Sequence, residues 1–374
     1  MFTYNEVYEA YVECYSKKKK TPGAMEFLFS WRESIMSLTN EINQRLYYPK
    51  PNTVFIIQDP KIREVFAADF RDRIVHHLII RELLPLFKNY FIPESFSCMP
   101  GRGTLYGVQT MAKYMNLCLD GWYVMKMDVS SFFMSIKKSY LARMLEDFIR
   151  SNYKDQRKLE DLVWLCNVLV LHDPTENCIR VGDLNLINKL PKEKSLFFLP
   201  QDKGLAIGNY TSQMFANFYM TPLDLFIKNI LGIQLYGRYV DDFMMYGPKE
   251  ILLDAAPKIR EFALNELDLT ISPEKFYIQP YEHGVKFIGS VIKPGRIYCG
   301  AKIQWALEKR IKSTYPGIDI DKDLSSINSY LGLMKHYSSF NIRKTILDNL
   351  PPSWDMYLSP NNDYTKLKKN KRVD

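Results

Sequence analysis

Two adjacent aspartates stand between two short apolar runs in the second half of the chain. Residues 239–242 are Tyr-Val-Asp-Asp, and the runs occupy residues 233–236 and 243–246. Two β-like runs with a short link predict a hairpin that carries the carboxylates at the tip of a sheet. Such a tip suits hard divalent cations, which prefer oxygen ligands and can drive phosphoryl transfer. An ordinary solvated turn is the alternative interpretation.

Composition limits the class of protein. The chain has 374 residues, 47% of them hydrophobic and 25% charged, which is typical of a globular protein with two or three subdomains. Aromatic residues make up 14%, and most of them are expected to fill the core. The net charge of +8 and the pI of about 8.9 favour a polyanionic partner without requiring one.

Basic residues gather near both ends of the chain. Residues 17–20 are four consecutive lysines, and a second group comprises Lys366, Lys368, Lys369, Lys371 and Arg372. Each group is either a solvated segment or a contact to phosphates.

The six cysteines contain no C-x-x-C pair, so we expect reduced thiols and no structural zinc. No signal-peptide pattern and no apolar run long enough to span a bilayer are found. We therefore expect a cytoplasmic protein without a membrane partner.

Helix-type and strand-type patterns alternate irregularly along the chain. Helices are expected at about 4–15, 25–46, 70–86, 104–119, 137–150, 156–171, 211–231 and 249–267, and in several pieces over 301–350. Strands are expected in a hairpin over 53–68 and at 123–129, 269–271, 276–278, 285–288 and 290–293. This order predicts an α+β core followed by a helical end.

Asp128 lies at the end of the expected strand 123–129. An aspartate there is either a helix N-cap or a partner of Asp241 across adjacent strands. In the second case the two carboxylates would hold two Mg²⁺ ions, with Mn²⁺ as a substitute. The carbonyl of Val129 would complete the coordination shell of the metal ions, and Asp242 would be a secondary ligand or a structural acceptor.

Three further features fit a bound nucleotide. Lys61 and Arg63 on the expected hairpin 53–68 are either a triphosphate clamp or solubilising charges. The loop 204–213 leads into a helix N-terminus, and glycines such as Gly208 permit close approach of a nucleotide, although they also suit an ordinary turn. Lys275 is either a proton donor to pyrophosphate or a surface lysine.

The order of these motifs resembles the palm of reverse transcriptases. The motifs are 125–128 with the following Phe132 and Phe133, then 204–213, 239–242, 269–275 and 287–289, and upstream 61–63 and 71–76 are similar to the fingers of retron and group II intron enzymes. The resemblance covers about residues 45–350. It implies an RNA-directed DNA polymerase that binds a template RNA, a DNA primer or cDNA, and deoxynucleotides.

The resemblance also implies subdomains and roles. It predicts a right-hand polymerase fold with an N-terminal helical segment (1–48), fingers (49–122), a palm (123–292, with an insertion near 173–203), a helical thumb (293–350) and a basic C-terminal tail (351–374). Phe133 would exclude a ribose 2′-hydroxyl, and Ile207, Gly208 and Gln213 would lie beside the nucleotide. Phe287, Ile288 and Gly289 would form the primer grip.

One departure from the common pattern points to a subfamily. Most reverse transcriptases carry Gln-Gly-x-x-x-Ser-Pro before the long helix, whereas residues 207–213 here are Ile-Gly-Asn-Tyr-Thr-Ser-Gln. This form resembles the reverse transcriptases of diversity-generating retroelements, in bacteria or their phages. These copy a template-repeat RNA with errors at adenines and require a small, basic, oligomeric accessory variability protein. The side chain of Ile207 cannot form a hydrogen bond. The enzyme would therefore lack a polar contact that favours the correct geometry of the incoming base.

Other interpretations remain open. A defence-associated reverse transcriptase can share this compact layout. Since only residues 351–374 follow the expected thumb, we do not expect the additional domains of a complete group II intron protein. A silent RNA-binding scaffold is disfavoured because all three carboxylates are present. An RNA-templated RNA polymerase is disfavoured by Phe133.

Overall fold

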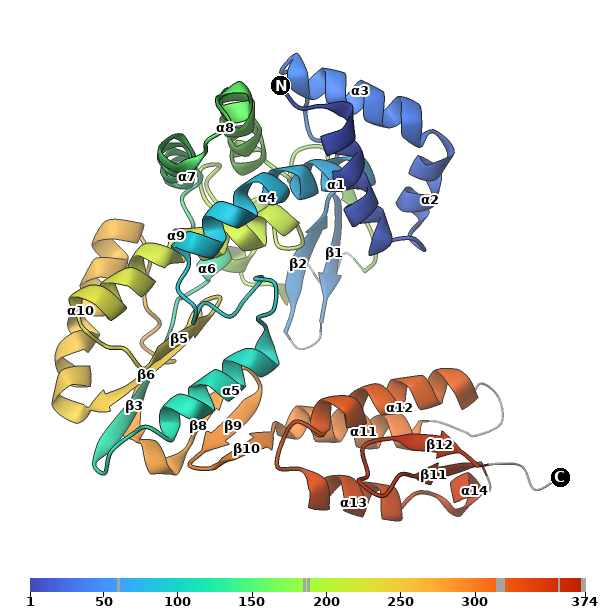
Figure 1. Ribbon diagram of the computed structural model, residues 1–374, viewed down its shortest axis with the longest axis vertical. Coiled ribbons are helices and arrows are strands. Elements are labelled where there is room, and N and C mark those ends of the chain that lie inside the picture. Colours follow the sequence, from blue (N-terminus) through green and yellow to red (C-terminus); the bar gives the residue numbers. More distant parts are fainter. Residues whose placement is uncertain (59–60, 184–185, 187–188, 314–319, 356, 371–374) are drawn as a thin grey trace. The chain divides into compact units, whose positions relative to one another are not determined.

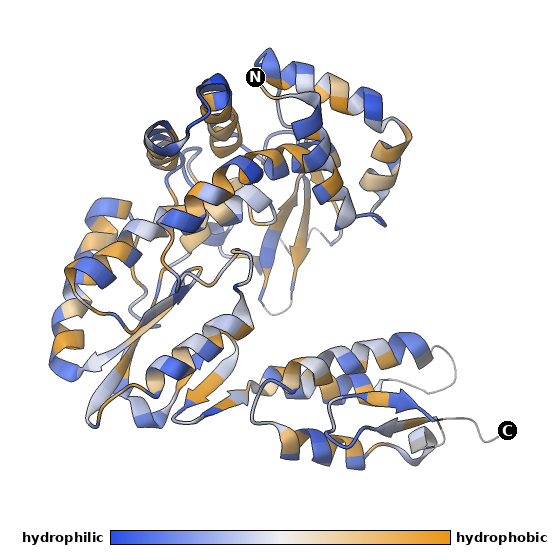
Figure 2. Ribbon diagram, viewed as in Figure 1, coloured by the Kyte–Doolittle hydropathy of each residue, from blue (hydrophilic) through white to orange (hydrophobic). Residues whose placement is uncertain are grey.

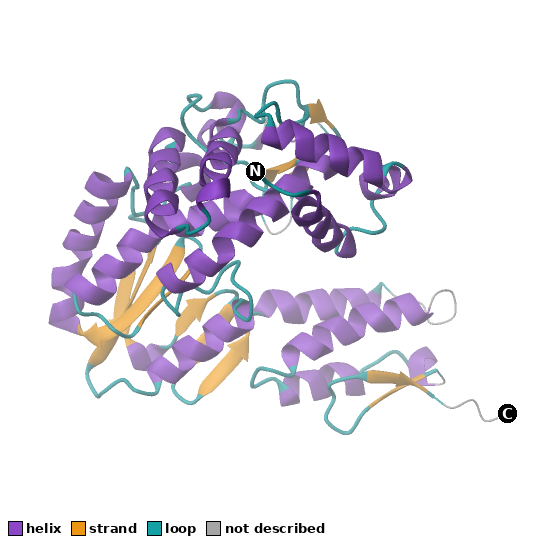
Figure 3. Ribbon diagram, turned by 45° about the horizontal axis from the view of Figure 1, so that its top comes forward, coloured by secondary structure: helices purple, strands orange, loops and turns teal. Residues whose placement is uncertain are grey.

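The computed structural model describes residues 1–58, 61–183, 186, 189–313, 320–355 and 357–370 (Figure 1). The chain forms two compact units that alternate along the sequence. The first comprises Met1–Met99, Met127–Gly232 and Ala255–Lys275, and the second comprises Pro100–Lys126, Ile233–Asp254 and Phe276–Asp374. Both contain helices and strands, which confirms the predicted α+β class (Figure 3). The boundaries of fingers, palm and thumb stay a prediction.

Helices build most of the first unit. They include α1 (Tyr4–Ser16), α2 (Pro22–Phe29), α3 (Trp31–Asn43), α4 (Phe70–Tyr90), α7 (Lys138–Asn152), α8 (Gln156–Leu171) and α9 (Tyr210–Leu225). The side chain of Asp69 caps the N-terminus of α4, and α4 packs against both α1 and α9. Ile74 and Leu78 on α4 are fully buried. Figure 2 shows hydrophobic and hydrophilic residues alternating along these helices, as amphipathic packing requires.

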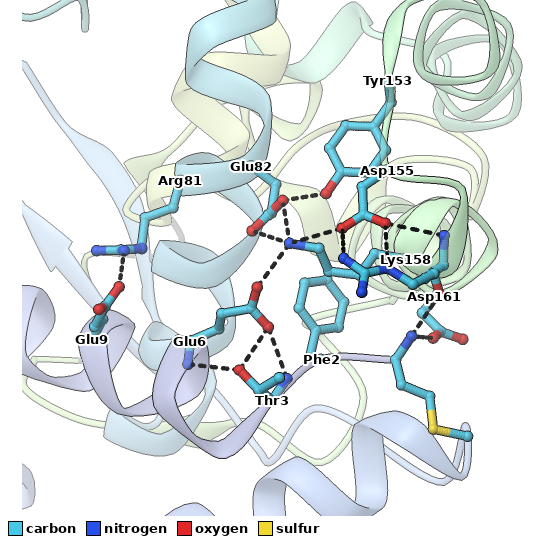
Figure 4. A network of polar contacts seen from close by, with 12 residues as sticks. Phe2, Thr3, Glu6, Glu9, Arg81, Glu82, Tyr153, Asp155, Lys158 and Asp161 are labelled. Carbon is cyan, nitrogen blue, oxygen red and sulfur yellow. Dashed lines mark hydrogen bonds and ion pairs between the residues drawn. The ribbon is translucent and has the colours of Figure 1, made fainter.

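A charged network joins three of these helices (Figure 4). The ammonium group of Lys158 on α8 lies 2.8 Å from Glu6 on α1 and 3.1 Å from Glu82 on α4. The Tyr153 hydroxyl donates a hydrogen bond to the same Glu82 carboxylate. Burial opposes the charge, but the bonds to Glu6 and Glu82 hold the pKa of Lys158 above its ordinary value. The network therefore connects α1 to α4 and α8.

The predicted hairpin over 53–68 is confirmed. Strand β1 (Thr53–Ile57) pairs antiparallel with β2 (Arg63–Ala67), and residues 59–60 of the turn lie outside the described residues. A short strand, β4 (Ile179–Arg180), comes from the expected insertion and pairs in parallel with β1. One edge of the hairpin is therefore covered by a segment more than a hundred residues away in the sequence.

The second unit is built around a four-stranded sheet. Its strands follow the order β5 (Tyr236–Tyr239), β6 (Asp242–Pro248), β3 (Trp122–Asp128) and β7 (Tyr277–Pro280), and the last two residues of β3, Met127 and Asp128, belong to the first unit. Helix α5 (Thr104–Met115) packs on β5, and α10 (Lys249–Leu267) follows β6. The predicted strand at 123–129 and the predicted hairpin around residues 239–242 are thereby confirmed.

A second sheet follows in the same unit. Strands β8 (Val285–Phe287) and β9 (Ser290–Lys293) confirm the expected strands at 285–288 and 290–293 and pair antiparallel. Strand β10 (Arg296–Cys299) pairs with β9 and was not predicted from the sequence. Helices α11 (Ala301–Lys312), α12 (Ile320–Met334) and α13 (Phe340–Asp348) confirm the expected helical pieces.

The segment expected to be a basic tail is folded over most of its length. It contains α14 (Pro352–Asp355) and an antiparallel hairpin of β11 (Leu358–Pro360) and β12 (Leu367–Lys369). Trp354, Leu358 and Leu367 are buried together with Leu307 of α11 and Leu331 of α12. The C-terminal hairpin is therefore part of the core formed by α11 to α13, while residues 371–374 lie outside the described residues.

The sequence predicted reduced thiols, and all six cysteines are free in the structure. Among the described residues, no helix combines the length and apolar character needed to cross a bilayer.

Candidate active site

The Asp-Asp hairpin has a tight and strained turn. Tyr239 pairs with Asp242, so Val240 and Asp241 alone form the link between β5 and β6. Val240 has φ of 61°, a left-handed conformation that a β-branched residue rarely adopts. The buried guanidinium of Arg238 donates a hydrogen bond of 2.8 Å to the Val240 carbonyl. Such strain persists only where the surroundings impose it, and it is frequent at active sites.

A lysine lies against the second aspartate of the turn. Lys126 Nζ is 2.9 Å from Asp242 Oδ2 and donates a second bond of 2.8 Å to the carbonyl of Lys286. The side chains of Lys126 and Asp242 are 16% and 24% exposed. The ammonium group therefore joins β3, the start of β6 and β8 within the second unit.

Asp128 belongs to the first unit and has its own lysine. Its side chain accepts a hydrogen bond from the Lys275 ammonium group, and its carbonyl accepts one of 2.8 Å from Ser272 N–H. Val129 forms an isolated antiparallel bridge with Ile271. The predicted strand at 269–271 is thus reduced to this bridge, which brings the predicted residues Asp128, Val129 and Lys275 together.

The residues predicted to surround a nucleotide are linked by main-chain bonds in the first unit. Phe133 lies on the short helix α6 (Phe132–Ser135), and its carbonyl accepts a bond of 2.8 Å from Leu205 N–H. The Ile207 carbonyl accepts a bond of 2.8 Å from Phe66 N–H on β2. The loop 204–208 is therefore fixed between α6 and the hairpin that carries Lys61 and Arg63.

Gly208 fills a place that no other residue fits without strain. Its φ is 125°, and an added Cβ would lie 2.6 Å from the Phe66 carbonyl oxygen. A larger residue would clash with β2 and would also require an unfavourable backbone conformation. The glycine keeps the loop in contact with the hairpin.

The hairpin presents its predicted clamp residues outward. Lys61 and Arg63 are exposed, whereas the next residue, Glu64, is buried. The Glu64 carboxylate accepts bonds from Ser195 Oγ and, at 3.0 Å, from Leu196 N–H. Burial raises the pKa of Glu64 above its ordinary value, although these bonds oppose the shift. Glu64 thus anchors the strand from which Arg63 projects.

Gln213 is exposed on α9 and accepts a bond of 3.3 Å from Cys98 Sγ. Two residues earlier, Thr211 Oγ1 lies 2.6 Å from His76 Nδ1. Burial lowers the pKa of His76 to about 3, so this histidine is neutral and its role is to fix the start of α9 against α4. No individual role was predicted for His76 from the sequence.

The predicted primer grip is a tight turn. Phe287 pairs with Ser290, and both residues between them have positive φ, 48° at Ile288 and 75° at Gly289. These values are typical of a type I′ turn. Phe287 is buried, and Gly289 is exposed.

Helix α11 has a basic and aromatic face that was not predicted from the sequence. Lys302, Trp305, Lys309 and Lys312 are all exposed and follow a spacing of three or four residues. Trp305 is 60% exposed, and Lys309 Nζ lies 4.9 Å from its ring centroid. The spacing itself was a signal, because it places these residues on one side of a helix. Such a face suits the phosphates of a nucleic acid.

The carboxylates have the right chemistry for a hard cation. Asp128 and Asp242 each already bind a lysine ammonium group through oxygen, and oxygen is the ligand that Mg²⁺ prefers. Within the described ranges, no group of three or more His, Cys, Asp or Glu side chains is close enough to hold a metal ion.

A family model for reverse transcriptase (RNA-dependent DNA polymerase) matches residues 48–292. The chain belongs to this family. All the predicted site residues of this reverse transcriptase, from Lys61 to Gly289, lie inside the matched range, whereas α11 and the C-terminal hairpin lie beyond it. The family accounts for the predicted right-hand polymerase fold.

Two solved structures similar to this reverse transcriptase are telomerases. One is from Candida albicans with a TWJ fragment of telomeric RNA (11% identity, TM-score 0.47, covering 83% of this chain and 56% of that one). The other is apo telomerase from Candida tropicalis (12% identity, TM-score 0.49, covering 84% of this chain and 60% of that one). The chain thus spans less than two thirds of either telomerase chain. No curated protein matches the sequence.

Proposed function

We propose that this reverse transcriptase copies an RNA template into DNA by extending a primer with deoxynucleotides. The observation that carries the proposal is the main-chain linkage of Phe133, the loop 204–208 and the Lys61–Arg63 hairpin, inside a family match that also contains the aspartates. A linkage of this kind holds nucleotide-contacting groups in fixed relative positions, which is what catalysis by orientation requires.

The three aspartates are proposed as the catalytic group. Asp128, Asp241 and Asp242, with the Val129 carbonyl, supply oxygen ligands for Mg²⁺ or Mn²⁺. When bound, two such ions would lower the pKa of the primer 3′-hydroxyl and stabilise the leaving pyrophosphate. The family match over residues 48–292, which contains all three aspartates, supports this grouping.

The remaining predicted residues are proposed to bind and orient the nucleotide. The primer 3′-oxygen forms a bond to the α-phosphorus, and the bond to the β-phosphate oxygen breaks. Lys61 and Arg63 would hold the triphosphate, Phe133 would exclude a 2′-hydroxyl, and Lys275 would supply a proton to the leaving pyrophosphate. Ile207, Gly208 and Gln213 would line the base side. The turn 287–289 would hold the primer end.

Primer extension tests this proposal directly. An RNA template annealed to a DNA primer, with deoxynucleotides and Mg²⁺, should be copied by the wild type and not by Asp241→Ala. Asp147→Ala, an exposed aspartate on α7, should retain full activity as the matched control. RNA binding without any extension by the wild type would instead support the scaffold interpretation. Extension with ribonucleotides alone would support an RNA polymerase.

A narrower proposal concerns the biological role. The Ile-Gly-x-x-x-Ser-Gln form of residues 207–213 supports a diversity-generating retroelement, in which a template-repeat RNA is copied with errors at adenines. A basic, oligomeric accessory variability protein would then be a partner in the bacterial cytoplasm. The DNA beside the gene tests this proposal: a pair of near-repeats that differ at adenines supports it. Their absence favours the defence-associated alternative or a group II intron-like enzyme without accessory domains.

A further inference from the structure

We propose that Lys126 is a positioning residue that sets the spacing between the Asp-Asp turn and the β8–β9 hairpin. The inference rests on the proposed polymerase function, because it assigns the turn to catalysis and the hairpin to the primer end. Lys126 lies two residues before Asp128, inside a strand that is otherwise mostly apolar.

A single ammonium group makes both contacts. Lys126 Nζ donates to the Lys286 carbonyl at 2.8 Å and lies 2.9 Å from Asp242 Oδ2. Lysine has three N–H donors, so one side chain can satisfy both oxygens at once. The ring centroid of Phe287 lies 5.9 Å from the same Nζ, within the range of a cation–π contact.

The position of these contacts gives them their significance. Asp242 is the first residue of β6 and follows Asp241 directly, and Lys286 immediately precedes the proposed primer-grip residues. All of these groups belong to the second unit. A fixed distance between the two elements would align a primer end with the carboxylates, and a misplacement of about 1 Å can cost roughly 100-fold in rate.

The charge of Lys126 adds a second effect. Its ammonium group offsets part of the negative charge on Asp242 and competes with any other cation for Oδ2. A neutral side chain would leave the full carboxylate charge available. Loss of Lys126 should therefore strengthen binding of a divalent ion while weakening catalysis.

Two substitutions separate this role from simple loss of charge. Lys126→Met keeps most of the length of the side chain and removes the donors, whereas Lys113→Met removes an exposed lysine on α5 of the same unit and is the matched control. We expect kcat for primer extension to fall about 10- to 100-fold in Lys126→Met. The KM for deoxynucleotide should stay within about twofold, because Lys61 and Arg63 are not altered. Lys113→Met should behave as the wild type.

Binding of Mn²⁺, followed by electron paramagnetic resonance without substrates, gives a readout that does not need turnover. We expect about threefold to tenfold tighter binding in Lys126→Met than in the wild type. Lys126→Arg keeps the charge with a different donor geometry, so it should retain wild-type Mn²⁺ binding and only part of the rate.

Several outcomes would overturn the inference. A wild-type kcat in Lys126→Met does so whatever the Mn²⁺ result. A reduced kcat with unchanged Mn²⁺ binding and a lowered unfolding temperature does so as well, because it indicates a general loss of stability. If the wild type itself extends no primer, the proposed function fails, and the Mn²⁺ titration still reports on the Lys126–Asp242 contact.

Discussion

The buried guanidinium group of Arg238 donates a hydrogen bond of 2.8 Å to the carbonyl oxygen of Val240, two residues along the chain. The bond holds Val240 in its left-handed conformation, in which φ is 61°. Because Val240 and Asp241 alone connect the two strands, the orientation of the Asp241 carboxylate depends on this bond.

Arg238→Met should therefore loosen the turn. Loss of a buried, charge-assisted bond predicts a decrease of about 1.5–3 kcal/mol in the free energy of unfolding. The rate of primer extension should fall by about tenfold or more, because the carboxylates lose their fixed orientation. Chemical denaturation and single-turnover extension measure the two effects. Arg296→Met, at an exposed position on β10, serves as the control. Full activity in Arg238→Met would show that the turn keeps its conformation without the hydrogen bond from Arg238.

Ile207→Gln should raise fidelity at template adenines. The glutamine would restore a hydrogen-bonding group beside the proposed base position. A wrongly paired base would leave this group without its hydrogen bond and would therefore be incorporated less often. Sequencing of cDNA made by the wild type and the variant measures the error spectrum. Ile207→Leu is the matched apolar control and should keep the wild-type errors. An unchanged spectrum in Ile207→Gln would contradict the role assigned to Ile207.

Phe133→Ala should permit incorporation of ribonucleotides. The aromatic ring is proposed to occupy the space that a ribose 2′-hydroxyl would need, and the 2′-hydroxyl is what separates the two substrates. The ratio of kcat/KM for a deoxynucleotide to that for its ribonucleotide measures the effect. Phe132→Leu tests the neighbouring ring, which is buried, and should leave this ratio unchanged. The same ratio in Phe133→Ala and the wild type would refute the assignment.

Asp72 predicts a pH dependence of stability. Burial raises the pKa of Asp72 to about 6, although Lys50 N–H, Arg71 and Tyr47 oppose the shift. A folded-state pKa above the unfolded value means that the folded state binds the proton more tightly. The contribution of Asp72 to stability is therefore largest below about pH 4 and is lost as the pH rises to about 6.

Asp72→Asn removes this titration. The difference in unfolding free energy between wild type and variant should change by up to about 3 kcal/mol between pH 4 and pH 6, in favour of the wild type at the lower pH. Urea denaturation at a series of pH values measures this difference. A difference that is constant over that range would place the pKa of Asp72 near its ordinary value.

The elements predicted correctly are those with a local signal. The hairpin over 53–68, the strand ending at Asp128 and the Asp-Asp hairpin each have a short apolar run with a clear boundary. Of the strands that were missed, β4 depends on a distant partner, β1. The other three pair with near neighbours in the sequence, β10 with β9 and β11 with β12, but each has only three or four residues and a weak apolar pattern. In the C-terminal segment the lysines obscured the few apolar residues that enter the core, such as Leu367.

The same limit applies to the candidate site. The acidic, glycine and aromatic residues stand out in the sequence because their chemistry is unusual at a strand end or a turn. Lys126 and Arg238 were missed, although a charged residue inside a buried strand is itself a signal that a polar partner is near. Which partner it has follows only from the packing of β3, β5, β6 and β8.

The bond from Phe66 N–H to the Ile207 carbonyl also constrains movement. If the β1–β2 hairpin swings when a triphosphate arrives, the loop with Ile207 and Gly208 must travel with it or give up this bond. Movement of the hairpin toward the phosphates and movement of the loop toward the base would then occur together. A substitution that changed the movement of the hairpin would then also change the contact that the loop makes with the base.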